Sequence, residues 1–474
     1  MALWQINRWF GGLSTGSKRG VDGAFAASQG LDFRTDPDVL QANYVMTKQS
    51  ASNVTGLVKW FAQYNTTYYA YADDGKIHSN ASSWTSLRTV ASSTGQGLAV
   101  FRESGTDYLY YAQNAQLGRY GDLAGSPSFT DNYQTLTTDT LWHPLKQFLN
   151  LLCIGNVGTL ATLSSTGTFT SAAITLPLGW KIKSLEVKGD LLFIGAWRGT
   201  AITDYEQGAI FSWDGTATTW NSVEFINESG VNALFNQSDT LYISAGTRGN
   251  LYVFSGGKFV KIKRIPNIGA GKTIEIFPGA MTGFNGIFHF GLSGASPSSA
   301  STTVAQGIYT WGQPEKNYPT VLNFDYPIST GTASGSGMNI GAVYGASPTV
   351  LLVGWKDAST YGIDQISTST LQTSVTYESL IYDAKAPYLP KLFKEIRIVT
   401  NGSGTVAVSY KADRASSYTS LTLASGSLST TTYLIYPFND STGFIRANEL
   451  QIKLTLSSGV QIIEADVFYD VGQI

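Results

Sequence analysis

The stretch that decides the fold is Leu241–Lys263, which reads LYISAGTRGNLYVFSGGKFVKIK. It contains three short alternating apolar segments, Leu241–Ala245, Asn250–Phe254 and Phe259–Lys263, separated by tight glycine-containing turns. Such a pattern is typical of a β-meander. The apolar segment Val231–Asn236 just upstream supplies a fourth strand. The unit is therefore a four-stranded antiparallel sheet of roughly 40 residues, the length of a propeller blade.

The centre of this unit recurs along the chain as a short apolar strand, a turn, and an aliphatic residue that opens the next strand. Seven aliphatic residues hold that last position: Ile77, Leu117, Leu160, Ile210, Leu251, Ile308 and Ile363. Neighbouring members are 40 to 57 residues apart, close to the repeat lengths of propellers. The sequence predicts an all-β fold with a β-propeller of about seven four-stranded blades, and six or eight blades remain compatible with the pattern.

The composition suits such a fold and limits the possible partners. Of 474 residues, 50 are Gly and 13% are aromatic, while only 14% are charged. Glycine permits tight turns, and aromatic residues favour strands. The net charge of −2 gives little electrostatic support for nucleic-acid binding. No apolar run is long enough for a signal peptide or a membrane span, so we expect synthesis in the cytoplasm.

Residues 1–50 do not follow the blade pattern, and we interpret them as an extended N-terminal arm. Trp4, Trp9 and Phe10 form an apolar cluster near its start. A free arm would not usually expose such residues, so they need a receiving surface. That surface lies either on the same chain or on a neighbouring subunit, and in the second case the three residues form an assembly arm. The segment Asn43–Thr47 has strand character and is a candidate for completing the last blade, which would remove exposed sheet edges.

The arm carries several short motifs: Gly11-Gly12-Leu13, the turn Ser17-Lys18-Arg19-Gly20, and Gly30-Leu31-Asp32-Phe33-Arg34 followed by Asp36-Pro37. On these motifs the opening of the chain resembles propeller-containing tail or virion structural proteins of tailed bacteriophages. The resemblance covers the arm closely and the blades only in architecture. It implies a structural role in a particle, with no catalytic residues to transfer.

The rest of the chain is expected to form two domains. Residues 51–375 are assigned to the propeller, and residues 376–474 to a C-terminal β-sandwich of jelly-roll or immunoglobulin-like type. Pro387 and Pro390 mark an ordered joint at the start of the sandwich. Leu450, Ile452, Leu454 and Leu456 alternate with polar residues, as in a sheet buried on one face.

The turn after the second strand of several blades carries indoles and cations. These candidate contact residues are Trp197, Arg198, Arg248, Trp355 and Lys356. Arg and Trp are enriched at interaction hot spots, so the residues are candidates for a surface that contacts a protein or a glycan. The alternative is that the two tryptophans pack between blades.

Motifs that carry chemistry are largely missing. The three histidines show no metal-ligand spacing, and no HExxH, CxxC, P-loop or GxSxG motif occurs. Cys153 lies in an apolar run and is expected to be a core thiol. The sequence therefore predicts no enzyme activity, no catalytic or metal-binding residues, and no cofactor.

Two functions remain open. The first is a structural component of a virion, at the tip, collar or nozzle of a tail. There it would form a symmetric homo-oligomer and contact other virion proteins. The alternative is a propeller that binds or degrades carbohydrate at a cell surface, with a host-surface glycan as partner. Carboxylates clustered in the central opening of the propeller would favour the alternative.

Overall fold

The computed structural model describes residues 1–14, 16, 18, 20–49, 53–81, 83–91, 94–199, 207–266, 268, 273–294, 306–331, 338–426, 433–438 and 444–471. In these residues the regular secondary structure consists of β-strands and includes no helix. The predicted all-β class is confirmed. Compactness divides the chain into one unit of residues 1–46, 309–327 and 367–474, and a second unit of residues 47–308 and 328–366.

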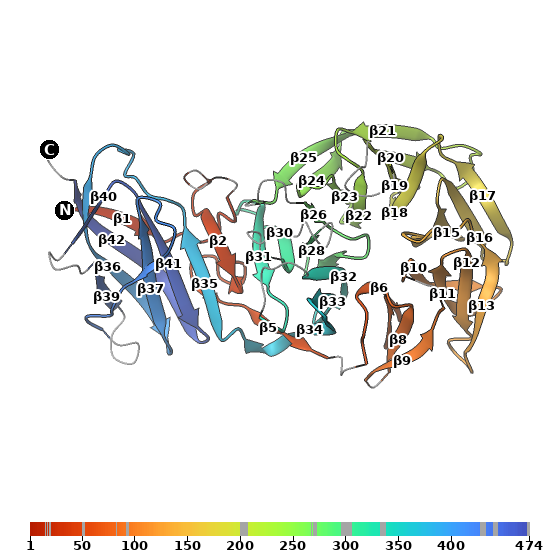
Figure 1. Ribbon diagram of the computed structural model, residues 1–474, viewed down its shortest axis with the longest axis horizontal. Helices are drawn as coiled ribbons and strands as arrows, with labels where there is room; N and C mark the ends of the chain where they lie inside the picture. Colours follow the sequence, from red (N-terminus) through yellow and green to blue (C-terminus); the bar gives the residue numbers. More distant parts are fainter. Residues whose placement is uncertain are drawn as a thin grey trace. The chain divides into compact units, whose positions relative to one another are not determined.

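The described residues form seven four-stranded antiparallel sheets that succeed one another in sequence, each built as a meander. Figure 1 shows these sheets, most of whose residues belong to the second unit, arranged around a common centre, which makes the fold propeller-like. In six sheets the four strands follow one another in sequence order, and in the seventh the N-terminal strand β5 takes the fourth place. The expected strand at Asn43–Thr47 thus completes the last sheet, as predicted.

The strands occupy equivalent places in the seven sheets. The first strands are β6 (Val58–Tyr64), β10 (Gly97–Glu103), β14 (Leu145–Phe148), β18 (Trp180–Lys188), β22 (Val231–Gln237), β27 (Met281–Phe284) and β32 (Asn339–Ser347). The second strands are β7 (Thr67–Ala72), β11 (Thr106–Gln113), β15 (Leu151–Asn156), β19 (Leu191–Arg198), β23 (Thr240–Ala245), β28 (Ile287–Gly291) and β33 (Val350–Asp357).

The third strands are β8 (Lys76–Asn80), β12 (Gln116–Gly121), β16 (Thr159–Ser164), β20 (Gln207–Trp213), β24 (Asn250–Ser255), β30 (Ile308–Gly312) and β34 (Thr360–Leu371). The fourth strands are β9 (Trp84–Thr89), β13 (Ser128–Thr135), β17 (Phe169–Thr175), β21 (Ser222–Ile226), β25 (Lys258–Arg264), β31 (Val321–Tyr326) and β5 (Tyr44–Lys48). A short two-stranded sheet joins β26 (Ile274–Glu275) to β29 (Ser293–Gly294).

The repeated aliphatic residue of the sequence pattern holds the predicted place in every sheet. All seven members lie in third strands and are at most 2% exposed: Ile77, Leu117, Leu160, Ile210, Leu251, Ile308 and Ile363. The position repeats because neighbouring sheets pack face to face and each needs an apolar side chain there. The sequence pattern thus marks buried positions between sheets rather than surface turns.

The turn between β24 and β25 shows why glycine is needed in the deciding stretch. Ser255 pairs with Lys258, which leaves Gly256 and Gly257 as the two central residues of a hairpin turn. Their φ angles are 59° and 78°, in the left-handed region that residues with a Cβ rarely adopt. Two consecutive positive φ angles match the right-handed twist of paired strands.

Apolar side chains fill the space between neighbouring sheets of the second unit. Leu152 and Ile154 of β15 belong to one cluster with Tyr110 and Leu117 of the preceding sheet. The last sheet packs on the first in the same way, since one cluster joins Val58 and Ala70 to Leu352 and Ile363. Burial of this kind stabilises a protein by about 25 cal/mol for each Å² of apolar surface.

The first unit contains two larger sheets. One has seven strands: β3 (Leu31–Asp32), β4 (Leu40–Ala42), β42 (Val460–Val471), β36 (Lys391–Gly402), β39 (Tyr433–Pro437), β1 (Ala2–Ile6) and β40 (Ile445–Ala447). The other has five: β2 (Phe25–Gln29), β35 (Ser374–Ser379), β41 (Leu450–Ser457), β37 (Val406–Ala412) and β38 (Thr419–Ser420). Tyr436 of the first sheet donates its hydroxyl hydrogen to the carbonyl oxygen of Val406 in the second, at 2.5 Å.

The expected division into residues 1–50, 51–375 and 376–474 differs from the structure. Residues 1–46 belong to the same compact unit as residues 367–474, and their strands β1 to β4 are members of its two sheets. The pairing of β1 with β42 runs from Ala2 opposite Tyr469 to Ile6 opposite Ala465. The N-terminal segment is therefore part of a domain, and a fragment that begins at residue 376 lacks β1, β3 and β4 of one sheet and β2 of the other.

Gly12 of the N-terminal segment is needed for close packing. A Cβ atom on Gly12 would lie 2.5 Å from Cβ of Val321, and the φ angle of Gly12 is 72°. The amide of Leu13 donates a hydrogen bond to the carbonyl oxygen of Leu322 at 2.8 Å. The N-terminal segment thus runs directly against the backbone around residue 321, where a side chain at position 12 would collide.

Candidate functional site

β-Bulges recur at one position in the first strands of four of the seven sheets. The bulges fall at Lys59 in β6, Lys183 in β18, Asn232 in β22 and Gly341 in β32, each at the second residue of a similar four-residue segment. These segments read VKWF, IKSL, VNAL and IGAV. A bulge leaves one residue unpaired in the ladder and changes the direction of its side chain, which is why bulges occur beside functional sites.

Two of the bulged residues are buried lysines that share one set of neighbours. Lys183 is fully buried, forms an ion pair with Glu275, and donates to Oδ1 of Asn232 at 3.0 Å. Lys59 is 9% exposed and donates to the carbonyl oxygen of Thr94 at 3.1 Å. The indole of Trp142 lies near both amines, 4.0 Å from Nζ of Lys59 and 5.6 Å from Nζ of Lys183. We call Lys59, Lys183, Asn232, Glu275 and Trp142 the inner lysine cluster.

Burial disfavours the charged form of both lysines. It lowers the pKa of Lys59 from 10.5 to about 8, against the opposing charges of Asp73 and Glu275, while the nearby Lys183 lowers this pKa further. The pKa of Lys183 is also lowered, mainly by burial, and Glu275 opposes that shift by charge and by hydrogen bonding. In the cluster, the amine of Lys183 has a direct carboxylate partner in Glu275. The amine of Lys59 instead contacts a carbonyl oxygen and the face of an indole.

Lys59→Met is expected to make unfolding less dependent on pH between pH 8 and about 10. Between these values the unfolded chain, with a lysine pKa of about 10.4, binds more protons than the folded chain does. The stability of the natural protein should therefore rise with pH in this window by about 3 kcal/mol from this residue. Chemical denaturation at several pH values should show the variant more stable at pH 8, with the difference shrinking towards pH 10. A constant difference would contradict the assigned environment of Lys59.

A pocket of about 400 Å³ lies along the same first strands, at the residues that follow the bulge positions. All seven first strands or the residues just before them contribute to its walls. The charged residues of its lining are Lys146 and Glu186, which form an ion pair at 2.7 Å. The hydroxyl group of Tyr344 donates to Oε1 of Gln63 at 3.3 Å on another part of the wall. We call this cavity the central pocket.

The predicted contact surface is not brought together as expected. Trp197 and Trp355 are 1% and 0% exposed, so both indoles are buried packing residues and not surface anchors. Arg198 and Arg248 are exposed, and Lys356 is half-buried with its ammonium 5.4 Å from the ring of Tyr361. The prediction erred because the tryptophans fall within second strands, where side chains alternate, rather than in the turns that follow.

The three aromatic residues of the proposed assembly arm pack on their own chain. Trp9 is fully buried, lies edge-on to Tyr377 with centroids 5.1 Å apart, and donates to the carbonyl oxygen of Ile463 at 3.3 Å. Trp4 stacks on Tyr382 at 4.4 Å, and Phe10 lies edge-on to Tyr318 at 4.8 Å. The receiving surface therefore lies on the same chain, which corrects the interpretation of these residues as an assembly arm.

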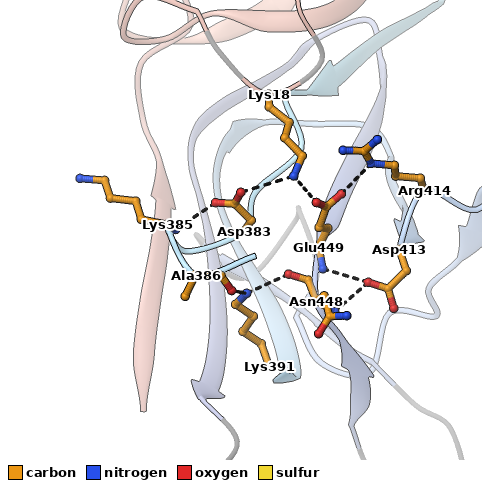
Figure 2. Close-up of polar contacts among 9 residues, drawn as sticks. All are labelled: Lys18, Asp383, Lys385, Ala386, Lys391, Asp413, Arg414, Asn448 and Glu449. Atoms are coloured by element: carbon orange, nitrogen blue, oxygen red, sulfur yellow. Dashed lines mark hydrogen bonds and ion pairs between the residues drawn. The ribbon is translucent and has the colours of Figure 1, made fainter. Parts of the chain in front are cut away.

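Next to the N-terminal segment, Figure 2 shows a network of ion pairs and hydrogen bonds. Lys18 contacts Asp383 and Glu449, and Arg414 contacts the second oxygen of Glu449 at 2.9 Å. These contacts lower the pKa of Glu449 against the opposing effect of its burial. The network, which we call the polar clamp, joins the N-terminal segment, the loop after residue 382 and the start of β41.

Lys391 is the buried part of the polar clamp. Its ammonium group donates to the carbonyl oxygens of Ala386 and Asn448, the second at 2.8 Å (Figure 2), and its side chain is fully buried. Burial lowers its pKa, and the nearby carboxylates oppose that shift. An ammonium held by two carbonyl oxygens fixes the loop in place.

Lys391→Met is expected to lower the free energy of unfolding of the first unit by about 2 kcal/mol, because two partly buried carbonyl oxygens lose their donor. Hydrogen exchange should also become faster in the loop of residues 383–390. Lys385→Met is the matched control, since Lys385 is exposed in the same loop. Equal effects of the two substitutions would contradict the role assigned to Lys391.

Sequence reasoning missed both the inner lysine cluster and the central pocket. A signal was present, because a lysine inside an apolar strand occurs at the same point of VKWF and IKSL.

Cys153 is buried as predicted, and burial raises its pKa to about 12. Among the described residues no three His, Cys, Asp or Glu side chains are grouped to hold a metal ion. The described part of the chain also contains no helix long and apolar enough to cross a membrane.

Comparisons with known proteins find only distant structural similarity. No family model matches the chain, and no curated protein matches it. The computationally designed protein Ika8 is 14% identical, with 76% of this chain and 99% of that chain covered and a TM-score of 0.41. The extracellular domain of BT4673 from B. thetaiotaomicron is 15% identical, with coverages of 85% and 48% and a TM-score of 0.48. The WD40 β-propeller domain of Doa1 is 11% identical, with coverages of 69% and 97% and a TM-score of 0.41.

Proposed function

We propose that the chain is a non-catalytic structural component of a bacteriophage virion. Its place is in the tail, at the tip, collar or nozzle, where it forms a symmetric oligomer and contacts other virion proteins. In this proposal the seven four-stranded sheets are the blades of a closed propeller. The two larger sheets form a β-sandwich that includes the N-terminal strands.

The observation that carries the proposal is the role of the residues on which the resemblance to virion proteins rests. Gly12 lies where a Cβ atom would collide with Val321. The half-buried Arg34 forms an ion pair with the buried Asp325 and donates to Oγ1 of Thr310 at 2.6 Å. A short motif is weak evidence of relationship when its residues lie free on the surface. It is stronger evidence when the local fold needs each of its residues. These residues therefore support a shared N-terminal substructure.

The state of the buried ionisable groups supports a role without catalysis. Lys183 and Arg34 form ion pairs with the buried carboxylates of Glu275 and Asp325, and Lys391 donates to the carbonyl oxygen of Asn448. Such pairs hold elements together, whereas a catalytic group must reach a substrate. Ser17 and Arg19 of the motif lie outside the described residues, so the resemblance is argued without them.

Apolar side chains on the outer strands of the second unit fit an assembly role. Phe225 in β21 is 58% exposed, and Val260 in β25 is 49% exposed. β21 and β25 are the fourth strands of neighbouring sheets and lie in contact with each other. An exposed aromatic residue and an exposed aliphatic one on two contacting outer strands are suitable contacts for another subunit.

Electron microscopy of particles propagated in their bacterial host tests the proposal. Antibody fragments raised against the purified chain should label tailed particles at one position along the tail, with one symmetric set of copies. Unlabelled particles, with the chain recovered only from other cell fractions, would contradict it. Phage carrying Phe225→Ser should assemble less efficiently, whereas the purified variant should keep its melting temperature.

Carbohydrate binding at a cell surface is the second candidate function, and the central pocket is the observation in its favour. Carbohydrate degradation is less well supported, because the usual glycosidase mechanism needs two carboxylates beside the scissile bond. The described lining of the pocket includes Glu186, which is paired with Lys146. Release of reducing ends from host polysaccharide that depends on Glu186 would support degradation.

A further inference from the structure

The central pocket is built by seven strands and not by one loop. Residues 60–63 come from β6, residues 98–100 from β10 and residues 343–344 from β32, and β14, β18, β22 and β27 add the remaining walls. First strands are edge strands of their sheets, and an edge strand presents backbone N–H and C=O groups that its own sheet does not pair. The walls therefore offer backbone donors and acceptors at fixed positions.

The lining has no net charge. Lys146 and Glu186 are its charged side chains, and their ammonium and carboxylate groups lie 2.7 Å apart. Glu186 also accepts a hydrogen bond from the amide of Val187 at 3.0 Å. An anionic or cationic ligand would meet a neutralised pair, so the site favours an uncharged molecule.

The remaining lining combines apolar faces with neutral polar groups. Phe61 and Tyr344 are half-buried, with ring centroids 6.3 Å apart. Gln63, Gln147 and Thr282 add amide and hydroxyl groups around them. The volume of about 400 Å³ falls within the range of roughly 300–1,000 Å³ of small-molecule sites. A ligand that fits must present hydroxyl groups at its edge and apolar C–H groups on its faces.

We propose that the central pocket binds a neutral saccharide of one or two sugar rings. The C–H face of a ring packs on Phe61 and Tyr344, while its hydroxyl groups bond to Gln147, to the Lys146–Glu186 pair and to the strand edges. The assignment adds a ligand site to the chain and does not depend on its place in a virion.

Titration calorimetry with the purified chain of 474 residues tests the proposal. The ligands are the neutral disaccharides maltose, cellobiose and N,N′-diacetylchitobiose, with sialyllactose as an acidic comparison. At least one neutral disaccharide should bind, and more tightly than sialyllactose. Gln147→Trp should weaken that binding by about tenfold or more, because the indole would fill the pocket from an exposed position.

The matched control is Gln207→Trp, which adds the same side chain at an exposed strand position outside the pocket lining. It should leave binding unchanged, and circular dichroism should show both variants folded. Absence of binding by every neutral disaccharide overturns the proposal, as does preference for sialyllactose or equal binding by the two variants. None of these outcomes affects the labelling of particles, so the two proposals fail separately.

Discussion

Trp9→Ala is expected to lower the free energy of unfolding of the first unit by about 3–5 kcal/mol, the usual cost of removing a buried tryptophan. The side chain is fully buried and packs edge-on against Tyr377 of β35. Its indole N–H donates to the carbonyl oxygen of Ile463 in β42. One side chain thus contacts both large sheets, and its loss leaves a cavity between them together with an unpaired carbonyl oxygen.

Calorimetry and denaturant unfolding of the purified monomer are the measurements. The transition of the first unit should move to lower temperature, and that of the second unit should stay in place. Trp4→Ala is the matched control, because Trp4 is only half-buried and its removal should cost clearly less. An unchanged melting temperature for Trp9→Ala, combined with failure to assemble, would restore the interpretation of this segment as an assembly arm.

The sequence predicted the parts of the fold that depend on neighbouring residues. A meander joins strands that are adjacent in sequence, so Leu241–Lys263 contains nearly all the information for its own sheet. The buried aliphatic at the start of each third strand has the same local origin, because it faces the next sheet wherever the unit repeats. The local pattern does not fix how many sheets close the ring, because closure depends on the angle between neighbouring sheets.

The N-terminal segment was misinterpreted because its partners are distant in sequence. β1 pairs with β42, and the paired residues Ala2 and Tyr469 lie at opposite ends of the chain. An alternating strand does not reveal which edge it joins, since many edges accept the same apolar pattern. The structure requires glycine at position 12 for close approach to Val321, a residue more than 300 positions along the chain.

The candidate site was missed for a different reason. Catalytic motifs are recognised by residue type and spacing, and the two lysines of the inner lysine cluster lie within apolar strands that match no such motif. Lys59 and Lys183 become neighbours of Trp142 only after three sheets are placed around a common centre and two strands form bulges. The predicted contact surface at Trp197 was wrong because the side chain is buried. Tryptophan is enriched at interfaces, but its large apolar ring is equally suited to packing inside a protein.

Glu275→Gln is expected to destabilise the second unit by about 3 kcal/mol at neutral pH, because it leaves a buried ammonium without its counter-ion. Lys183 is fully buried, and the described alternatives for its amine are Oδ1 of Asn232 and the face of Trp142. A glutamine has nearly the same shape as glutamate, so the substitution removes charge with little change in packing. Asp239→Asn is the matched control, since it removes the carboxylate that pairs with Lys188 of the same strand but is largely exposed, and it should cost less than about 1 kcal/mol.

The pH dependence separates loss of charge from general damage. Glu275 raises the pKa of Lys183, so its removal lowers that pKa further below the unfolded value. The unfolded chain then binds more protons than the folded chain over a wider range, and the stability of Glu275→Gln should rise with pH more steeply than that of the natural protein. Denaturant unfolding from pH 7 to pH 9.5 should therefore show that the stability lost in Glu275→Gln becomes smaller as pH rises.

The double variant Lys183→Met with Glu275→Leu should regain most of the lost stability, because neither buried charge remains. A deficit that is independent of pH and persists in the double variant would show that position 275 matters for its shape and that the ion pair does not hold the cluster together.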